Sequence, residues 1–166
     1  MSEKRVEVPL IETDIVAHVS RVGGVLVHQV NNRRAAGRGL AAQIARQWPE
    51  WYAAFRIHPP HPTPPQLGHA WLMEMVPPSI HCAHGVWVAS LYAQDGYGTD
   101  RIYTDLGLLR ASLRSLVVIL GRYGATPPPI FVPYNMGCGL GGEEWENVLP
   151  ILYSEIPFPW TICALP

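Results

Sequence analysis

Two glycine-bearing segments have residue types and spacing suited to binding an anion. In the first, VLVHQVNNRRAAGRGLAAQIARQW at residues 25–48, an apolar strand pattern runs into a turn-rich loop (residues 33–39, the first loop) and then into a helical pattern. The second loop, MGCGLGG at residues 136–142, also lies between an apolar stretch and a helical pattern. Free backbone N–H groups at a helix start favour an anion. Two such loops predict one phosphate-bearing ligand between them.

Three titratable residues lie where strands are expected to end, and each has a catalytic or binding interpretation beside a structural one. His28, near the end of the strand at residues 24–30, could be a general base or a hydrogen-bonded core residue. Asp95 follows a later strand and could be a catalytic carboxylate or an Asx-turn residue. Asp14 could accept from a ligand or cap a short helix at residues 15–19, and both roles can coexist.

Arginines and histidines raise two further possibilities. Arg33, Arg34 and Arg38 lie around the first loop, where they could bind phosphate or simply be solvated. Potential zinc ligands occur between residues 58 and 84, namely His58, His61, His69, His81, Cys82 and His84. Their spacing matches no closed set of four ligands, so we predict no metal site and no cofactor.

The elements that position these residues follow from hydrophobic periodicity and turn residues. Strands are expected at residues 5–10, 24–30, 68–76, 85–92, 130–132 and 160–164, the third and fourth forming a hairpin. Helices are expected at residues 39–48, 50–57, 105–123 and 143–154, with Pro49 interrupting the first two. Glu143 and Glu144 would lie in the first turn of the last helix. Residues 58–65 are proline-dense and predict a stiff surface loop. About six strands interleaved with helices predict a three-layer α/β/α sandwich.

Composition narrows the class of protein. The 166 residues fit one domain spanning 1–166. A net charge of −1 with 15% charged residues provides no basic footprint for nucleic acid or an anionic membrane. No apolar run approaches the roughly 20 residues of a membrane span, and the first residues lack the apolar core of a signal peptide. Three cysteines without metal-type pairing fit reduced thiols, so a cytoplasmic location is expected.

Three segments, in order along the chain, resemble the macrodomains that bind ADP-ribose. They are Thr13-Asp14-Ile15, LVHQVNN followed by AGRGLAAQI, and IFVPYNMGCGLGGEEWENV, of which the last is the most specific. The resemblance covers nearly the whole chain. It implies a mixed six-stranded sheet with ADP-ribose or a derivative in a cleft above the strand ends.

The resemblance also implies roles for individual residues. Asp14 would accept from the adenine amino group beside the backbone of Ile15, and Asn31 would contact the distal ribose. The amides of the two loops would bind the diphosphate through a set comprising Gly37, Arg38, Gly39, Leu40, Gly137, Cys138, Gly139, Leu140, Gly141 and Gly142.

Within the macrodomains, the chain looks most like a small subgroup of ADP-ribose-1″-phosphate phosphatases and deacylating or deribosylating hydrolases. His28 falls on a histidine that the phosphatases use catalytically, and Asp95 is a candidate partner. The resemblance therefore implies a phosphohydrolase acting on ADP-ribose 1″-phosphate. The alternatives are a binding module without chemistry and an ADP-ribosyl hydrolase that uses water.

Departures from the family pattern bear on these alternatives. One glycohydrolase branch uses a lysine near the distal ribose and an aspartate where this chain has Gly141. The only lysine here is Lys4, so a lysyl-adduct mechanism lacks its nucleophile. Arg38 interrupts the usual glycine run of the first loop and could reach a terminal phosphate or obstruct the cleft. Nucleic acid is expected only as an ADP-ribosylated substrate.

Overall fold

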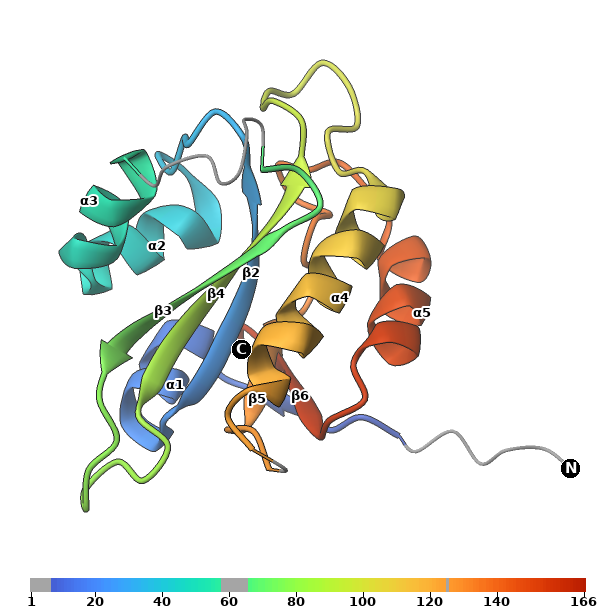
Figure 1. The fold of residues 1–166 in the computed structure, drawn as a ribbon. Helices are drawn as coiled ribbons and strands as arrows, with labels where there is room; N and C mark the ends of the chain where they lie inside the picture. Colours follow the sequence, from blue (N-terminus) through green and yellow to red (C-terminus); the bar gives the residue numbers. More distant parts are fainter. Residues whose placement is uncertain (1–6, 58–65, 125) are drawn as a thin grey trace, which may run out of the picture.

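The computed structural model describes residues 7–57, 66–124 and 126–166, which form one mixed α/β fold (Figure 1). Its elements in chain order are β1 (Leu10–Glu12), α1 (Ile15–Val22), β2 (Gly24–Asn31), α2 (Gly39–Gln47), α3 (Pro49–Ile57), β3 (Ala70–Val76), β4 (Val86–Gln94), α4 (Leu106–Gly121), β5 (Ile130–Pro133), α5 (Trp145–Glu155) and β6 (Trp160–Ala164). The described strands form a six-stranded sheet in the order β1-β6-β5-β2-β4-β3. Only β3 runs antiparallel to its neighbour in this sheet.

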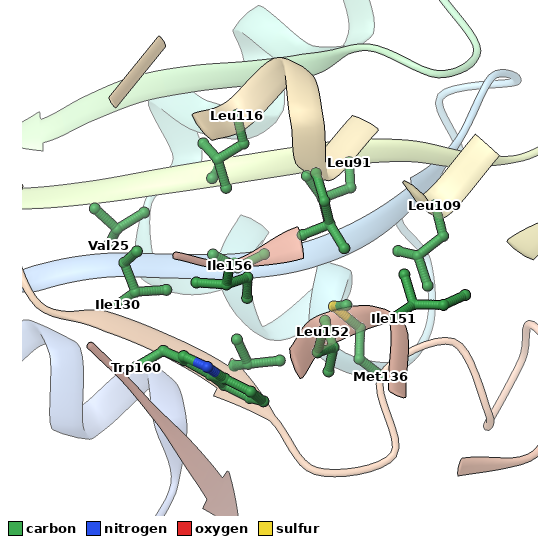
Figure 2. Packing of buried hydrophobic residues seen from close by; sticks show 14 of the residues in the cluster. Val25, Leu91, Leu109, Leu116, Ile130, Met136, Ile151, Leu152, Ile156 and Trp160 are labelled. Atoms are coloured by element: carbon green, nitrogen blue, oxygen red, sulfur yellow. The ribbon is translucent and has the colours of Figure 1, made fainter. Parts of the chain in front are cut away.

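Helices cover both faces of the sheet because the central strands carry apolar side chains on both sides (Figure 1). On β2, Val25 and Val27 point toward α4 and α5, whereas Leu26 and Val30 point toward α1, α2 and α3. Figure 2 shows the cluster on the α4 and α5 side, which includes Leu109 and Leu116 of α4, Leu152 of α5 and Trp160 of β6. The predicted three-layer α/β/α sandwich with a mixed six-stranded sheet is therefore confirmed.

Several predicted elements are found close to their expected places. The hairpin is β3 and β4, and the long helix is α4, capped by Asp105, whose Oδ1 accepts from the Leu108 N–H at 2.9 Å. The interruption at Pro49 is also present, because α2 ends at Gln47 and proline occupies the first position of α3, where no N–H is needed. The proline-dense stretch 58–65 lies outside the described residues.

Two boundaries were predicted wrongly. Among the described residues the first strand is Leu10–Glu12 rather than part of residues 5–10, because Pro9 lacks an N–H and pairing with β6 begins at Leu10; residues 5 and 6 lie outside the described part of the chain. The last helix begins at Trp145, so Glu143 and Glu144 precede it. The second loop continues through these residues, since the Glu143 N–H donates to the Gly137 carbonyl at 3.1 Å. The Glu143 carboxylate instead accepts from the Glu144 N–H and the Asn147 amide, both at 2.9 Å.

The parallel strands place three connections at one edge of the sheet. The loops after β2, β4 and β5 all leave the carboxyl ends of adjacent strands, the position where α/β proteins bind ligands. No helix among the described residues has both the length and the apolar character needed to cross a membrane.

Candidate functional site

A cleft of about 690 Å³ lies at this edge, between the loops that follow β2, β4 and β5. Both glycine loops line it, and they approach closely: a Cβ atom on Gly39 would lie 3.7 Å from Cδ1 of Leu140. Of the three arginines near the first loop, Arg38 lines the cleft, whereas the Arg34 guanidinium donates to the Arg56 carbonyl at 3.3 Å. The structure therefore brings the two predicted loops to one groove.

The first loop presents the uncapped start of α2 to the cleft. Arg38 occupies the N-cap position with extended backbone angles, but its side chain caps nothing. The first turn closes with a long hydrogen bond of 3.4 Å from the Ala42 N–H to the Arg38 carbonyl. Among the described residues, nothing accepts from the N–H groups of Gly39, Leu40 or Ala41. A helix start in this condition attracts an anion.

The second loop presents a matching set of amides. Its internal hydrogen bonds use the N–H groups of Cys138 (2.9 Å to the Asn135 carbonyl) and Gly142 (3.2 Å to the Gly139 carbonyl). In the described part of the chain no acceptor is bonded to the N–H groups of residues 139–141, all of which line the cleft. Neighbouring free amides in a turn form an anion-binding concavity. The two loops thus place polar hydrogens on both sides of the groove.

Asn31 shapes the first loop with its side chain. Oδ1 accepts from the N–H groups of Arg33 (3.0 Å) and Ala35 (3.1 Å), while Nδ2 donates to the Ala35 carbonyl at 3.0 Å. The side chain is 7% exposed and lines the cleft, with one amide hydrogen left for a ligand. Its predicted contact with a distal ribose stays a prediction.

His28 lies deep in the wall of the cleft. Its side chain is 1% exposed, Nε2 lies 2.8 Å from Ser90 Oγ, and the ring packs edge-on against Trp51 at 5.3 Å. Burial lowers the pKa of His28 to about 3, so the imidazole is neutral and weakly basic near neutral pH. Nδ1 is buried and has no hydrogen-bond partner among the described residues. These features suit a packed core histidine, and its catalytic role stays a prediction.

Asp95 is hydrogen bonded to Asn32, whereas His28 is bonded to Ser90. The Asp95 carboxylate accepts from the Asn32 amide at 2.9 Å, and Oδ1 of Asn32 in turn accepts from the Gly96 N–H at 2.8 Å. Asp95 is exposed and is not part of the cleft wall. The predicted pair of Asp95 with His28 is therefore not hydrogen bonded, and Asp95 ties the loop after β4 to Asn32, directly before the first loop.

Asp14 and Ile15 lie beyond one end of the cleft. Oδ1 of Asp14 accepts from the Ala17 N–H at 2.9 Å, so Asp14 caps α1, and Ile15 is buried beneath it. Thr13 bonds to the Ala164 carbonyl at the end of β6, which places both residues beside the outer strands. Neither lines the cleft, and the predicted adenine contact stays a prediction.

Cys138 and Gly142 belong to the second loop but do not line the cleft. Burial, followed by Glu143, Glu146 and Glu144, raises the pKa of the Cys138 thiol to about 11. The thiol therefore stays protonated and unreactive near neutral pH. Within the described ranges, no group of three or more His, Cys, Asp or Glu residues is arranged to hold a metal ion.

Sequence reasoning missed several residues of the site. Tyr97, Thr99 and Tyr134 line the cleft, and Gln29 and Gln94 form part of its wall. Tyr97 could have been found from the sequence, because glycines flank it at positions 96 and 98. In the structure both glycines adopt positive φ angles (86° and 155°). No local pattern distinguishes the other four.

Comparisons with known proteins place this geometry in a recognised fold. No protein-family model and no curated protein matches the sequence. Among solved structures, a Bacteroides thetaiotaomicron protein of unknown function superposes with a TM-score of 0.77 at 21% identity, over 96% of this chain and 98% of that one.

Two other similar solved structures are a DarG macrodomain and a DarTG that contains ADP-ribose. The macrodomain of Mycobacterium tuberculosis DarG has a TM-score of 0.70 at 19% identity, over 95% of this chain and 97% of that one. A Thermosipho africanus DarTG in complex with ADP-ribose has a TM-score of 0.70 at 24% identity, over 93% of this chain and 40% of that one. The chain therefore has the macrodomain fold.

Proposed function

We propose that this protein is a macrodomain that binds ADP-ribose or a close derivative, with the diphosphate held between its two glycine loops. The observation that carries the proposal is the pair of opposed amide rows at residues 39–41 and 139–141. Each row offers N–H groups that lack an acceptor among the described residues, which suits a dianionic linker more than an uncharged ligand. The similar Thermosipho africanus structure, which contains ADP-ribose, supports the same ligand.

The order of the strands suggests how the ligand is oriented. The diphosphate would lie over β2 and β5, which end in the two loops. Asp14, the adenine contact implied by the macrodomain resemblance, lies toward β1 and β6, beyond Tyr134. The distal ribose would then lie toward β4, against Asn31 and Tyr97. Any group attached to that ribose would meet the loop after β4.

The geometry favours binding over catalysis. The imidazole of His28 is neutral, buried and bonded to Ser90, and the carboxylate of Asp95 is engaged by Asn32. No lysine or unpaired carboxylate of the described residues lines the cleft. We therefore propose a binding module, and the phosphatase activity implied by the resemblance is the second candidate, favoured by the position of His28 in the cleft wall.

Calorimetric titration with ADP-ribose tests the proposed ligand. We expect saturable binding in the micromolar range, corresponding to about 8 kcal/mol, and much weaker binding of adenosine, which lacks the diphosphate. Absence of heat or chemical-shift change at millimolar ADP-ribose would exclude this function.

Phosphate release from ADP-ribose 1″-phosphate tests the second candidate. If the protein is a binding module, the wild type binds this compound without releasing phosphate. If it is a phosphatase that depends on His28, the wild type releases phosphate and the substitution His28→Ala reduces the rate by about 100-fold or more while ADP-ribose still binds.

A further inference from the structure

Three polar side chains meet beside the second loop, and two of them also form part of the cleft wall. Gln29 comes from the end of β2, Gln94 ends β4, and Thr104 precedes α4. Gln94 and Thr104 are 8% and 6% exposed, and Gln29 is partly buried. Buried polar groups of this kind are retained when their hydrogen bonds fix a particular geometry.

The hydrogen bonds of this cluster converge on the second loop. Nε2 of Gln29 donates to Gln94 Oε1 at 2.8 Å and to Thr104 Oγ1 at 2.7 Å. The Thr104 hydroxyl in turn donates to the carbonyl of Gly137 at 2.8 Å. The hydroxyl of Thr104 is thus both an acceptor and a donor, and its proton is directed at the start of the loop.

The backbone of Thr104 holds the other end of the same loop. The N–H groups of Tyr103 and Thr104 donate to the Gly141 carbonyl at 2.9 Å and 3.1 Å. Thr104 itself pairs with Gln94 in an antiparallel bridge, and Asp105 bonds to the Ala93 carbonyl at 2.9 Å, so its position is fixed by β4. Thr104 is therefore hydrogen bonded to the carbonyls of both Gly137 and Gly141, and the loop's free amides belong to residues between and including Gly139 and Gly141.

The second loop packs closely against Thr104 and Gln29. A Cβ atom on Gly141 would overlap Thr104 Oγ1 and the Gly137 carbonyl oxygen. A Cβ atom on Gly137, where φ is 78°, would lie 2.9 Å from Gln29 Oε1. The loop is closed tightly around the threonine hydroxyl.

The Gln29 side-chain amide donates two hydrogen bonds within the cluster, whereas its carbonyl oxygen accepts none. Its Oε1 is buried and has no hydrogen-bond partner in the described part of the chain. An apolar side chain would avoid this unpaired oxygen but could not donate to Gln94 and Thr104 together. We therefore attribute the glutamine at position 29 to the two hydrogen bonds that its amide group makes with Gln94 and Thr104.

We propose that Thr104 is a positioning residue, which with Gln29 behind it holds the second loop in the shape that presents the amides of residues 139–141 to the ligand's diphosphate. The proposal rests on the proposed function for its ligand, but the shape of the loop can be measured without any ligand.

The substitution Thr104→Val tests this role, because valine keeps the shape of threonine and removes only the hydroxyl. We expect ADP-ribose affinity to fall about tenfold, as for the loss of a hydrogen bond that orients a binding group. Thr104→Ser, which keeps the hydroxyl, should restore most of the affinity. Thr161→Val in β6, a partly buried threonine outside the cleft, is the matched control and should bind as the wild type does.

A double substitution tests whether Gln29 acts through Thr104. Gln29→Leu combined with Thr104→Val should weaken binding no more than Thr104→Val alone, because residues that act as a unit are non-additive. Additive losses would show that Gln29 acts independently and would overturn that part of the proposal.

Backbone order parameters separate the loop's shape from ligand binding. In the free protein, the amides of residues 139–141 should become more mobile in Thr104→Val and remain as in the wild type in Thr104→Ser. Unchanged mobility with unchanged affinity would overturn the proposal, as would a failure of serine to restore either quantity. If the wild type does not bind ADP-ribose, the proposed function fails, and the order parameters alone decide whether Thr104 positions the loop.

Discussion

At the scale of single residues, the site depends on positions where a side chain is either absent or fully engaged. Gly141 has no room for a Cβ atom. The Asn31 side-chain amide makes three hydrogen bonds to the backbone of the first loop. Under the proposed function, backbone amides of the two loops would supply much of the recognition of the diphosphate. Substitutions should act mainly through the shape of the loops.

The substitution Gly141→Ala should damage the second loop directly. The new methyl group would overlap Thr104 and the Gly137 carbonyl, and such overpacking costs about 1–3 kcal/mol of unfolding free energy. We expect ADP-ribose affinity, measured by calorimetry, to fall more than about tenfold. Gly121→Ala, at the end of α4, adds a methyl group with no atom within 4 Å apart from the neighbouring backbone of its own helix, and should leave both quantities unchanged or raise stability by up to about 1 kcal/mol. Equal affinity in both variants would contradict the assigned loop.

His28 should make stability depend on pH. Burial lowers its pKa from 6.5 to about 3, so between these values the unfolded chain binds a proton that the folded protein rejects. Stability contributed by the neutral ring is therefore complete above pH 6.5 and is lost toward pH 3, by about 1.4 kcal/mol per pH unit. Urea unfolding of wild type and His28→Gln across this range should show a smaller slope in the variant, and parallel curves would exclude a buried neutral His28.

At the scale of elements, α2 begins without a side-chain cap at the edge of the cleft. The helix begins at Gly39 without a side-chain cap, whereas Asp14 caps α1 and Asp105 caps α4. A capping residue is usually worth about 1 kcal/mol, so its absence here is a cost in the free protein. An anion bound at the same N–H groups would remove that cost, which links the local instability of α2 to the proposed ligand.

The substitution Arg38→Asp should therefore stabilise the free protein and weaken ligand binding. An aspartate at this position can cap α2, adding about 1 kcal/mol to the unfolding free energy measured in urea. The same carboxylate would occupy and repel the site of the diphosphate. Arg38→Ala, which adds no cap, should leave stability nearly unchanged and keep the amides available. If aspartate and alanine give the same affinity, the start of α2 does not bind the ligand.

At the scale of the whole molecule, the sheet joins the parts of the site. The two loops follow neighbouring strands β2 and β5, and the loop after β4 is tied to both, through Asn32 and through Thr104. Net charge contributes little, because the formal value is only −1, so attraction for an anion is local to the cleft. A ligand held by loops from both central strands should stabilise the entire fold.

ADP-ribose should accordingly raise the melting temperature. At a concentration 100 times Kd the unfolding free energy increases by about 2.7 kcal/mol, which corresponds to roughly 5–10 °C for a domain of this size. Scanning calorimetry with increasing ligand measures this shift. Gly141→Ala should show a smaller shift at equal ligand concentration, and a wild-type melting temperature independent of ligand would contradict binding to the folded state.

The sequence by itself determined the features that depend on neighbouring residues: the β3–β4 hairpin, the break at Pro49, the long helix α4 and the two strand–loop–helix segments. Strand and helix periods, turn residues and proline chemistry are local properties, so they can be read along the chain. Only the tertiary structure decided that His28 packs against Trp51, that Asp95 turns to Asn32, and that Gln29 reaches Thr104, 75 residues away. Those contacts arise from the order of strands in the sheet, which no local pattern specifies.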